Sequence, residues 1–451
     1  MALVIILFII EFLLLMFVVI STSFDYTCPS FLTLIMFSLS TLSLVYNHAN
    51  WDVTFHFTTF AIIVCGLLTL VLVDLSISSR YRKLRELRED SGFERVESEH
   101  PWVNDGVMKT IILASSVLMM LLYLRDVRSI GRLLSSTSLI SSIGVVQQSE
   151  FHTGAIATIC LRIGYALSNL YAFIFCHNVI LSRQKVRKNL YLLAAMLTGV
   201  VSTFFSGSRS LLLGTVFAFI FFLITFSRIR GGWKEIKINK YLKYIIPAGI
   251  VFILVFYGFR NAIKNRQYSV GLLDYITYYI GNSQQLLNVA TQDLSAAWPI
   301  SGSYPGLYTF QFLYNELAGY RILSVPTHIS SNFMRMGGSG VLTRGNVYTL
   351  FGEPYHDFGF IGMLVFVALF YYIFCHFYYK YIRNWRNREK NKRVLLVFGS
   401  MYYYIVLTFY TTPTVWFKIQ TIISLIIVVI AYRFFTKCRF SRRTRLYTES
   451  I

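Results

Sequence analysis

The chain has 451 residues, of which 55% are hydrophobic and only 14% are charged. Soluble globular domains carry about 25% charged residues, so this composition excludes an ordinary soluble protein and indicates a membrane protein. The formal net charge of +21 would also suit a nucleic-acid-binding protein, and the positions of the basic residues decide between the two.

Apolar runs long enough to cross a bilayer occur along the whole chain. Because a spanning helix needs roughly 20 apolar residues, we predict an all-α polytopic integral membrane protein with about eleven transmembrane helices and one large external loop. The first run lacks a basic n-region and a small-residue cleavage site, so we interpret it as a retained span. The predicted spans are residues 2–20, 30–46, 53–75, 109–124, 156–182, 190–206, 211–227, 244–259, 358–379, 394–411 and 416–434.

The basic residues gather between these runs. They lie in segments 80–88, 183–188, 228–243, 380–393 and 437–445. These segments alternate with loops nearly free of lysine, which is the positive-inside pattern. We therefore predict that the basic segments and the C-terminus face the cytoplasm, where they also attract anionic membrane lipids. No basic face with interleaved aromatic residues recurs, so we expect no nucleic-acid partner.

This topology predicts three parts. Residues 1–259 form an N-terminal bundle of about eight spans with a charged cytoplasmic loop at 79–108, residues 260–357 form the large external loop, and residues 358–451 form a C-terminal bundle of about three spans with a basic tail. The six cysteines show no metal-ligand spacing. Since acidic residues are also few on the external side, we predict neither a metal site nor a cofactor.

Several arginines fall at one depth. Counting about 20 residues outward from the basic boundary of each span brings Arg162, Arg209 and Arg260 to the outer interface, together with residues 357–359 of a fourth span. Snorkelling toward headgroups is the alternative for Arg162 and Arg260. Arg209 lies in "FSGSRSLLLG", a tight turn between two adjacent spans, and is placed where an anionic group at the membrane surface would lie.

The stretch "GEPYHDFG" at 352–359 is dense in titratable groups. Glu353, His356 and Asp357 lie within five positions, and a histidine or a carboxylate can act as a general base. These three are our catalytic candidates. The alternative for Asp357 is to cap a helix that begins at Phe358.

The external segment is rich in tyrosine, asparagine, glutamine and glycine. Aromatic faces stack on sugar rings and amides bind hydroxyl groups, so this composition suits carbohydrate. The alternative is that the aromatic residues pack against helices of the loop itself.

Two stretches, "SGSRSLLLG" and "RGNVYTLFGEPYHDFGFIG", resemble those of the Wzy-type polymerases of O-antigen and capsule repeat units, as do the span count and the single large external loop. The resemblance implies a metal-independent glycosyltransferase of the bacterial cytoplasmic (inner) membrane with its active site on the external face. A growing glycan would leave its undecaprenyl diphosphate carrier and join the next lipid-linked oligosaccharide. The products would be O-antigen of lipopolysaccharide, capsule or exopolysaccharide, and a chain-length regulator and a repeat-unit flippase are implied as partners.

The resemblance also implies roles for individual residues. The motifs cover Arg209, Asn346, Tyr348, Thr349, Asp357 and Gly359. External arginines of this family bind the diphosphates, which assigns Arg209 by motif and, by position alone, Arg162, Arg260, Arg266 and Arg344. Asn346, Tyr348 and Tyr355 are the expected glycan-binding residues.

Two other functions fit parts of the pattern. An O-antigen ligase has the same architecture but transfers the glycan to a lipid A core. A flippase or other transporter performs no chemistry and predicts internal pseudo-symmetry and polar residues in mid-membrane, of which Glu11 is the main example here.

Overall fold

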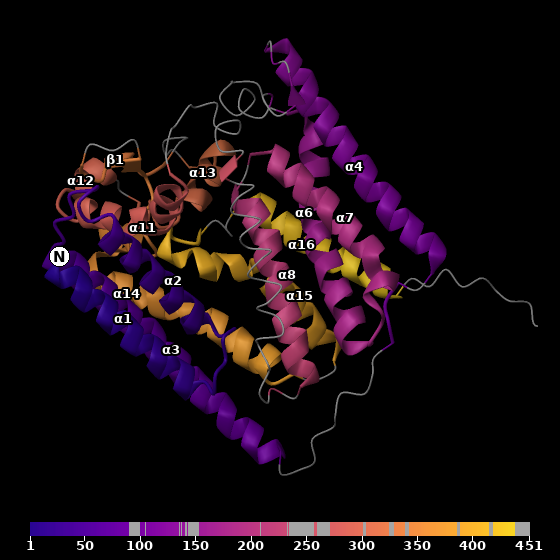
Figure 1. Ribbon diagram of the computed structural model, residues 1–451, viewed down its shortest axis with the longest axis horizontal. Coiled ribbons are helices and arrows are strands. Elements are labelled where there is room, and N and C mark those ends of the chain that lie inside the picture. The colour runs from indigo at the N-terminus through magenta and orange to yellow at the C-terminus, as the bar shows by residue number, and fades with distance from the viewer. Residues whose placement is uncertain are drawn as a thin grey trace, which may run out of the picture. The chain divides into compact units, whose positions relative to one another are not determined.

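A computed structural model (Figure 1) describes residues 1–89, 100–103, 105–134, 136, 138–139, 142, 153–207, 209–231, 233, 257–258, 271–300, 304–323, 329–338, 342–385, 388–414 and 418–437. Within these ranges, ten helices are long and apolar enough to cross a membrane. The strands described there are β1 (Met334–Arg335) and β2 (Arg344–Gly345), which pair antiparallel. The fold is thus helical, consistent with a polytopic membrane protein.

The chain divides into two compact units: residues 1–95 with 231–423, and residues 96–230 with 424–451. The first unit contains α1 (Ala2–Ser21), α2 (Pro29–Tyr46), α3 (Phe57–Glu89), α11 (Leu272–Ala290), α12 (Leu294–Ala297), α13 (Gln311–Gly319), α14 (Gly352–Phe377) with its π-helical end η3 (Tyr378–Arg383), and α15 (Glu389–Val406) with η4 (Leu407–Phe409). The second contains α4 (Gly106–Leu133), α6 (Ala155–Cys176), η1 (His177–Leu181), η2 (Val186–Asn189), α7 (Leu190–Phe205) and α8 (Arg209–Arg230). Helix α16 (Ile419–Lys437) begins in the first unit and continues in the second.

Ten of the eleven predicted spans have a helical counterpart, and all but residues 257–258 of the predicted span 244–259 lie outside the described residues. The ends of these helices differ more from the predicted bounds than their positions along the chain do. Helix α3 continues to Glu89, and α14 includes residues 352–358 before an interruption at Gly359, after which its spanning part begins close to the predicted Phe358. Hydropathy locates the apolar stretch, whereas charged residues with good helix propensity prolong α3 beyond it.

Helix α1 buries one narrow face in the first unit. Val4, Leu7, Glu11 and Val18 are buried, at spacings of three, four and seven residues that place them on one side of a helix. The opposite side exposes large apolar residues such as Ile20. A helix with this pattern suits a position at the edge of a bundle, facing lipid.

Helix α11 belongs to the segment predicted as an external loop, yet it packs along the spanning helix α2. Gly281 makes the close approach possible, because a Cβ atom there would lie 2.7 Å from Cβ of Ser43. Further along, the Gln284 side chain accepts a hydrogen bond from Thr41 (3.0 Å) and donates one to the carbonyl of Phe37 (3.3 Å). The polar residues of α11 therefore reach the middle of α2.

The first unit has two distinct ends along its helices. At one end, here called the loop end, the Asn288 amide donates to the carbonyl of Thr54 (2.7 Å), and the N–H of Leu350 donates to the carbonyl of Thr408 (2.7 Å). At the other, here called the basic end, the Tyr378 hydroxyl donates to Asp25 (2.7 Å) in the turn between α1 and α2. Asn288 and Leu350 of segment 260–357 thus lie at the loop end, whereas the described part of segment 380–393 begins at the basic end, as the predicted topology requires. The compartment that each end faces stays a prediction.

The second unit is held by close helix contacts and aromatic packing. Gly199 of α7 lies against α6, where a Cβ atom would be 2.7 Å from the carbonyl oxygen of Gly164. The segment before α4 docks on η1: the Trp102 ring stacks on His177 with 3.4 Å between centroids, and the Asn178 side chain bonds both the N–H and the carbonyl of Trp102 (2.9 Å each). This connection is fixed by side chains rather than by regular secondary structure.

Candidate functional site

The residues of "GEPYHDFG" form a short helical segment set off from the rest of α14. Gly359 interrupts the helix with φ 69° and ψ −174°, a conformation that is essentially restricted to glycine. Residues 352–358 therefore form a separate segment at the loop end, before the membrane-spanning part of α14. His356 and Asp357 lie next to this interruption.

His356 and Asp357 contact each other directly. Nδ1 of His356 lies 3.0 Å from Oδ1 of Asp357, and Oδ2 of Asp357 accepts a hydrogen bond from the N–H of Thr309 (2.6 Å). The alternative role of Asp357 as a cap of the spanning part of α14 is not observed, because Oδ1 faces His356 and Oδ2 accepts the N–H of Thr309. In the described parts of the chain, Nε2 of His356 makes no hydrogen bond, and the side chain is 20% exposed.

Two aromatic rings enclose the histidine. The rings of Trp298 and Tyr308 lie 5.2 Å and 5.3 Å from that of His356, between centroids. Trp298 is held by a hydrogen bond from its Nε1 to the Ser331 hydroxyl (3.0 Å), and the Tyr308 hydroxyl accepts one from the N–H of Ile300 (2.8 Å). Burial, with a smaller effect of the Asp357 charge, raises the pKa of Tyr308. Tyr308 therefore stays neutral and acts as a wall of the site.

Glu353, the third catalytic candidate, lies behind this pair. Its residue is 1% exposed, and its carboxyl accepts a hydrogen bond from the Thr412 hydroxyl (2.6 Å). Thr412 follows η4, so this bond ties the start of α14 to the segment after α15. This buried position favours a supporting role for Glu353 over direct contact with a substrate.

The motif residues that precede α14 also hold the start of this helix in place. Thr349 has φ +61°, and its hydroxyl accepts a hydrogen bond from the N–H of Phe351 (3.2 Å). Tyr348 is fully buried, stacks near Trp298 and donates to the carbonyl of Asn332 (2.6 Å). Because no face of the Tyr348 ring is open to a sugar, its position favours a structural role over the predicted glycan contact. Asn346 and Tyr355 are both half-buried, and glycan binding by these two residues stays a prediction.

The arginines are spread over both units. Arg344 is exposed on β2, where it lies opposite Arg335 in the ladder, and Arg335 is exposed as well. Two like charges in such a pair repel each other, so a bound anion would stabilise the ladder. Arg260 and Arg266 lie outside the described residues.

Arg162 and Arg209 belong to the second unit. Arg162 is half-buried in α6, two turns from the start of that helix, and Arg209 is the first residue of α8. The Arg209 side chain lies outside the described part of the structure. A cavity shared by Arg209, Glu353, His356 and Asp357 would involve both units and stays a prediction.

Sequence reasoning missed four residues of this site: Trp298, Thr309, Thr412 and Arg335. Trp298 and Thr309 come from the segment before α14, and Thr412 comes from the segment after α15. None stands in a recognisable motif. The available signal was indirect, since a tryptophan in an otherwise polar external segment is a candidate for a buried aromatic wall.

The side chains of this site can carry out acid–base chemistry. In the ranges that the structure covers, no group of three or more His, Cys, Asp or Glu side chains could hold a metal ion. A histidine whose Nδ1 faces a carboxylate and whose Nε2 is unbonded can accept a proton at Nε2. No protein-family model, curated protein or solved structure matches this chain, so its function has to be argued from these residues.

Proposed function

We propose that this protein polymerises lipid-diphosphate-linked oligosaccharides at the outer face of a bacterial cytoplasmic membrane, with His356 as the general base. The observation that supports this most is the His356–Asp357 pair, which lies at the loop end of a membrane-spanning helix, with Nε2 of the histidine making no hydrogen bond to the described residues. The resemblance in "RGNVYTLFGEPYHDFGFIG" includes these same residues.

In the proposed reaction, a sugar hydroxyl of the incoming lipid-linked unit lies beside Nε2 of His356. Nε2 takes the hydroxyl proton as the oxygen bonds to the anomeric carbon of the growing glycan. The bond between that carbon and the phosphate oxygen breaks, and the lipid diphosphate leaves with the electron pair. Asp357 keeps the proton on Nδ1 and stabilises the imidazolium that forms, as a carboxylate partner does for other catalytic histidines.

Arginines would hold the leaving diphosphate. A guanidinium group binds phosphate oxygens through two parallel hydrogen bonds, and the charge of the leaving group grows in the transition state. In the first unit, the exposed pair Arg335 and Arg344 is suited to this role because an anion would relieve the repulsion between them. Arg209 is the corresponding candidate in the second unit.

The proposal is tested in a strain that lacks the gene and carries His356→Gln. We expect membrane abundance to equal that of the unchanged protein, while polymerised glycan falls by at least about 10²-fold, the usual scale for loss of a general base. His48→Gln is the matched control, because His48 also lies at the loop end of the first unit, in the turn after α2. Normal polymerisation with His356→Gln would overturn the role of His356.

The same experiment separates polymerase from ligase and transporter. Loss of a polymerase leaves single lipid-linked repeats on the outer face, whereas loss of a ligase leaves long lipid-linked polymer. Loss of a transporter leaves single repeats on the cytoplasmic face. Accumulation of long lipid-linked polymer would replace our proposal with the ligase, for which the same histidine and aspartate could serve.

A further inference from the structure

Helix α13 turns its polar side toward the protein. The Tyr314 hydroxyl donates to the carbonyl of Pro305 (2.9 Å), and the Asn315 side chain bonds both the carbonyl and the N–H of Ile329 (2.9 and 2.8 Å). Ala318, one turn further, is buried. These three positions define the inner face of the helix.

The outer face of α13 is mainly apolar. Leu313 and Leu317, both half-buried, and Tyr320, just past the helix end, follow at intervals of four and three residues and share one side, with the half-buried Glu316 at its border. Tyr320 is 62% exposed, and Ile322, in the turn that follows, is 65% exposed. A surface helix in water shows the opposite arrangement, with apolar residues inward and polar residues outward. The arrangement of α13 is the one expected for a helix whose outer face meets apolar surroundings.

Ring contacts with α14 give the level of α13 relative to the expected membrane boundary. The Phe310 ring, at the start of α13, lies 6.5 Å from the Phe358 ring and 6.1 Å from the Phe366 ring of α14, between centroids. Phe366 comes seven residues after Gly359 (366 − 359), which is about 10 Å along a helix. Counting about 20 residues back from Lys380 places the hydrocarbon boundary near Gly359. By this count, Phe310 at the start of α13 lies between the hydrocarbon boundary, near Phe358, and a level about 10 Å inside it, near Phe366.

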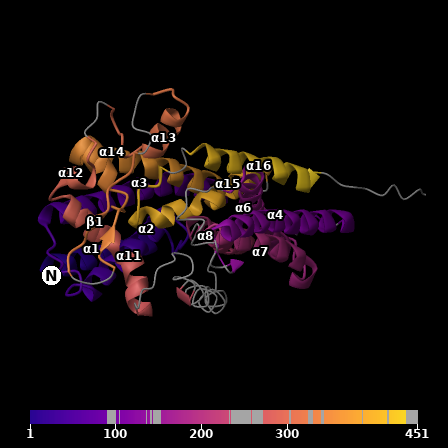
Figure 2. The same cartoon turned by 90° about the horizontal axis from the view of Figure 1, so that it is seen from above.

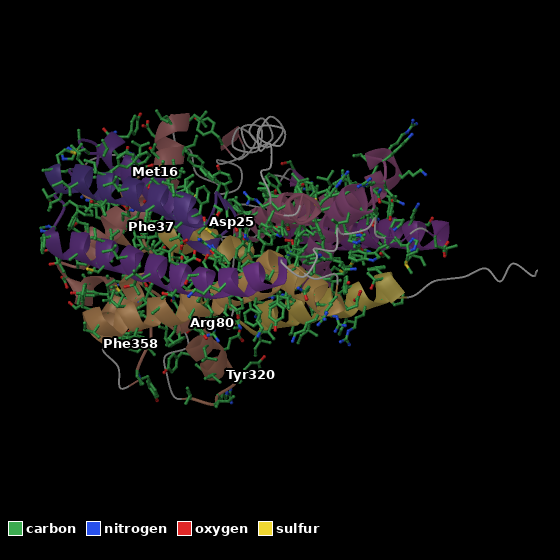
Figure 3. The ribbon with its side chains drawn as sticks, turned by 90° about the horizontal axis from the view of Figure 1, so that it is seen from below. Met16, Asp25, Phe37, Arg80, Tyr320 and Phe358 are labelled. Carbon is green, nitrogen blue, oxygen red and sulfur yellow. The ribbon has the colours of Figure 1, made fainter. Side chains whose placement is uncertain are left out.

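Basic residues flank this apolar face. Nζ of Lys418 lies 4.3 Å from the centroid of the Phe312 ring, and Arg321 is exposed beside Tyr320. Lysine, arginine and tyrosine next to apolar residues are typical of the membrane–water interface. Figure 2 shows α13 standing out beside α14, and Figure 3 shows Tyr320 at the edge of the molecule, away from the spanning helices.

We propose that Leu313, Leu317, Tyr320 and Ile322 form a lipid-binding face, and that α13 lies in the membrane interface at the loop end. The occupant is the lipid of that leaflet. The N–H of Thr309, just before α13, bonds Asp357, so the face would bring the lipid surface next to the candidate site. This inference goes beyond the proposed function and does not depend on it, because lipid contact is measured without any reaction.

The experiment uses the full chain in liposomes, with Leu317→Cys and Tyr320→Cys each labelled by an NBD fluorophore. Lipids that carry a nitroxide high on the acyl chain quench a fluorophore only within the membrane. We expect these lipids to quench both positions several-fold more than position 49 in Ala49→Cys, an exposed residue of the turn after α2. The signal of the labelled parent protein, whose native cysteines remain, is subtracted.

Iodide in the aqueous phase provides the opposite test. Strong iodide quenching of positions 317 and 320 together with weak nitroxide quenching would place the face in water and overturn the proposal. Weak quenching by both would show that protein covers the face, which overturns it as well. Two labelled positions guard against failure of one variant to fold.

Discussion

Nδ1 of His356 lies 3.0 Å from Oδ1 of Asp357, although the two residues are neighbours in sequence. Consecutive residues of a regular helix point in different directions and do not face each other. Here the helix is interrupted at Gly359, and the N–H of Thr309 donates a hydrogen bond to Asp357 (2.6 Å). The contact between His356 and Asp357 therefore forms beside an interrupted helix, not within a regular one.

Replacing Asp357 by asparagine tests the orientation of His356. An amide can still accept the Thr309 N–H, but it no longer offers a charged acceptor to Nδ1, so the imidazolium formed during proton transfer loses its stabilisation. We expect Asp357→Asn to lower polymerised glycan by at least about 10²-fold at unchanged membrane abundance. Asp293→Asn is the control, because Asp293 caps α12 at the same end. Equal activity of the two variants would refute the role of Asp357.

Much of the fold could be predicted from the sequence, and much of the site could not. The spans follow from local apolar runs, which hydropathy measures directly. Contacts across the fold leave no local signal: Thr309 precedes Asp357 by 48 positions (357 − 309), and Trp298 precedes His356 by 58 (356 − 298). Helix α11 also escaped prediction as a packed element, since its glutamine and asparagine residues suit a solvated loop until Thr41 and the carbonyl of Phe37 are seen to satisfy Gln284.

The motif residues show the same limit. The resemblance predicts a glycan contact for Tyr348, whose motif also includes Thr349, whereas the structure uses the Tyr348 hydroxyl and the Thr349 backbone to shape the start of α14. A motif marks where a chain is constrained but does not say whether the constraint comes from chemistry or from packing.

Gly359 allows a direct test of the helix interruption. Space is open around it, with no atom within 4 Å of an added Cβ, so an alanine there would suffer only from the backbone conformation. That cost is on the order of 1–3 kcal/mol, and we expect Gly359→Ala to lower the thermal unfolding midpoint of the detergent-solubilised protein. Gly106→Ala, at the first position of α4, also has open space but no positive φ. If both variants unfolded at the parental temperature, the interruption at Gly359 would be absent.

Glu11 offers a test of the buried polar contacts between α1, α2 and α11. The Gln284 amide nitrogen donates a hydrogen bond to the carbonyl of Phe37, and its Oε1 accepts one from the Thr41 hydroxyl. The single hydroxyl hydrogen of Thr41 is therefore engaged. Glu11 of α1 is fully buried, and its carboxyl oxygens make no hydrogen bond to the described residues. Because a buried charge without a partner is costly, we expect the Glu11 carboxyl group to carry a proton.

We therefore expect Glu11→Gln to change the free energy of unfolding little, because the amide is also uncharged and nearly equal in size. Thr41→Val should lower stability by about 1–3 kcal/mol, since it leaves buried polar groups unpaired. Unfolding of the purified protein in denaturant, followed by tryptophan fluorescence, measures both. A large loss with Glu11→Gln would show that Glu11 is ionised and paired.

Substitutions at Arg209 test the proposed binding of the lipid diphosphate. It begins α8 directly after the turn that follows α7, between serine residues in "SGSRSLLLG". If it binds a diphosphate through two parallel hydrogen bonds, lysine cannot replace it, because an ammonium group offers a point charge without the planar pair of donors. If it only reaches for headgroups, lysine should serve nearly as well.

We expect Arg209→Lys and Arg209→Ala to remove most polymerised glycan while the protein still inserts at normal abundance. Arg187→Lys and Arg187→Ala are the controls, because Arg187 is an exposed arginine of the basic segment between α6 and α7. Each variant is expressed in the strain that lacks the gene, and glycan length is compared at equal membrane abundance. Full-length glycan with Arg209→Lys would refute the two-bond contact, because charge alone would then suffice. Full-length glycan with Arg209→Ala would remove this arginine from the site, and the diphosphate would have to be held by Arg335 and Arg344 or by arginines outside the described residues.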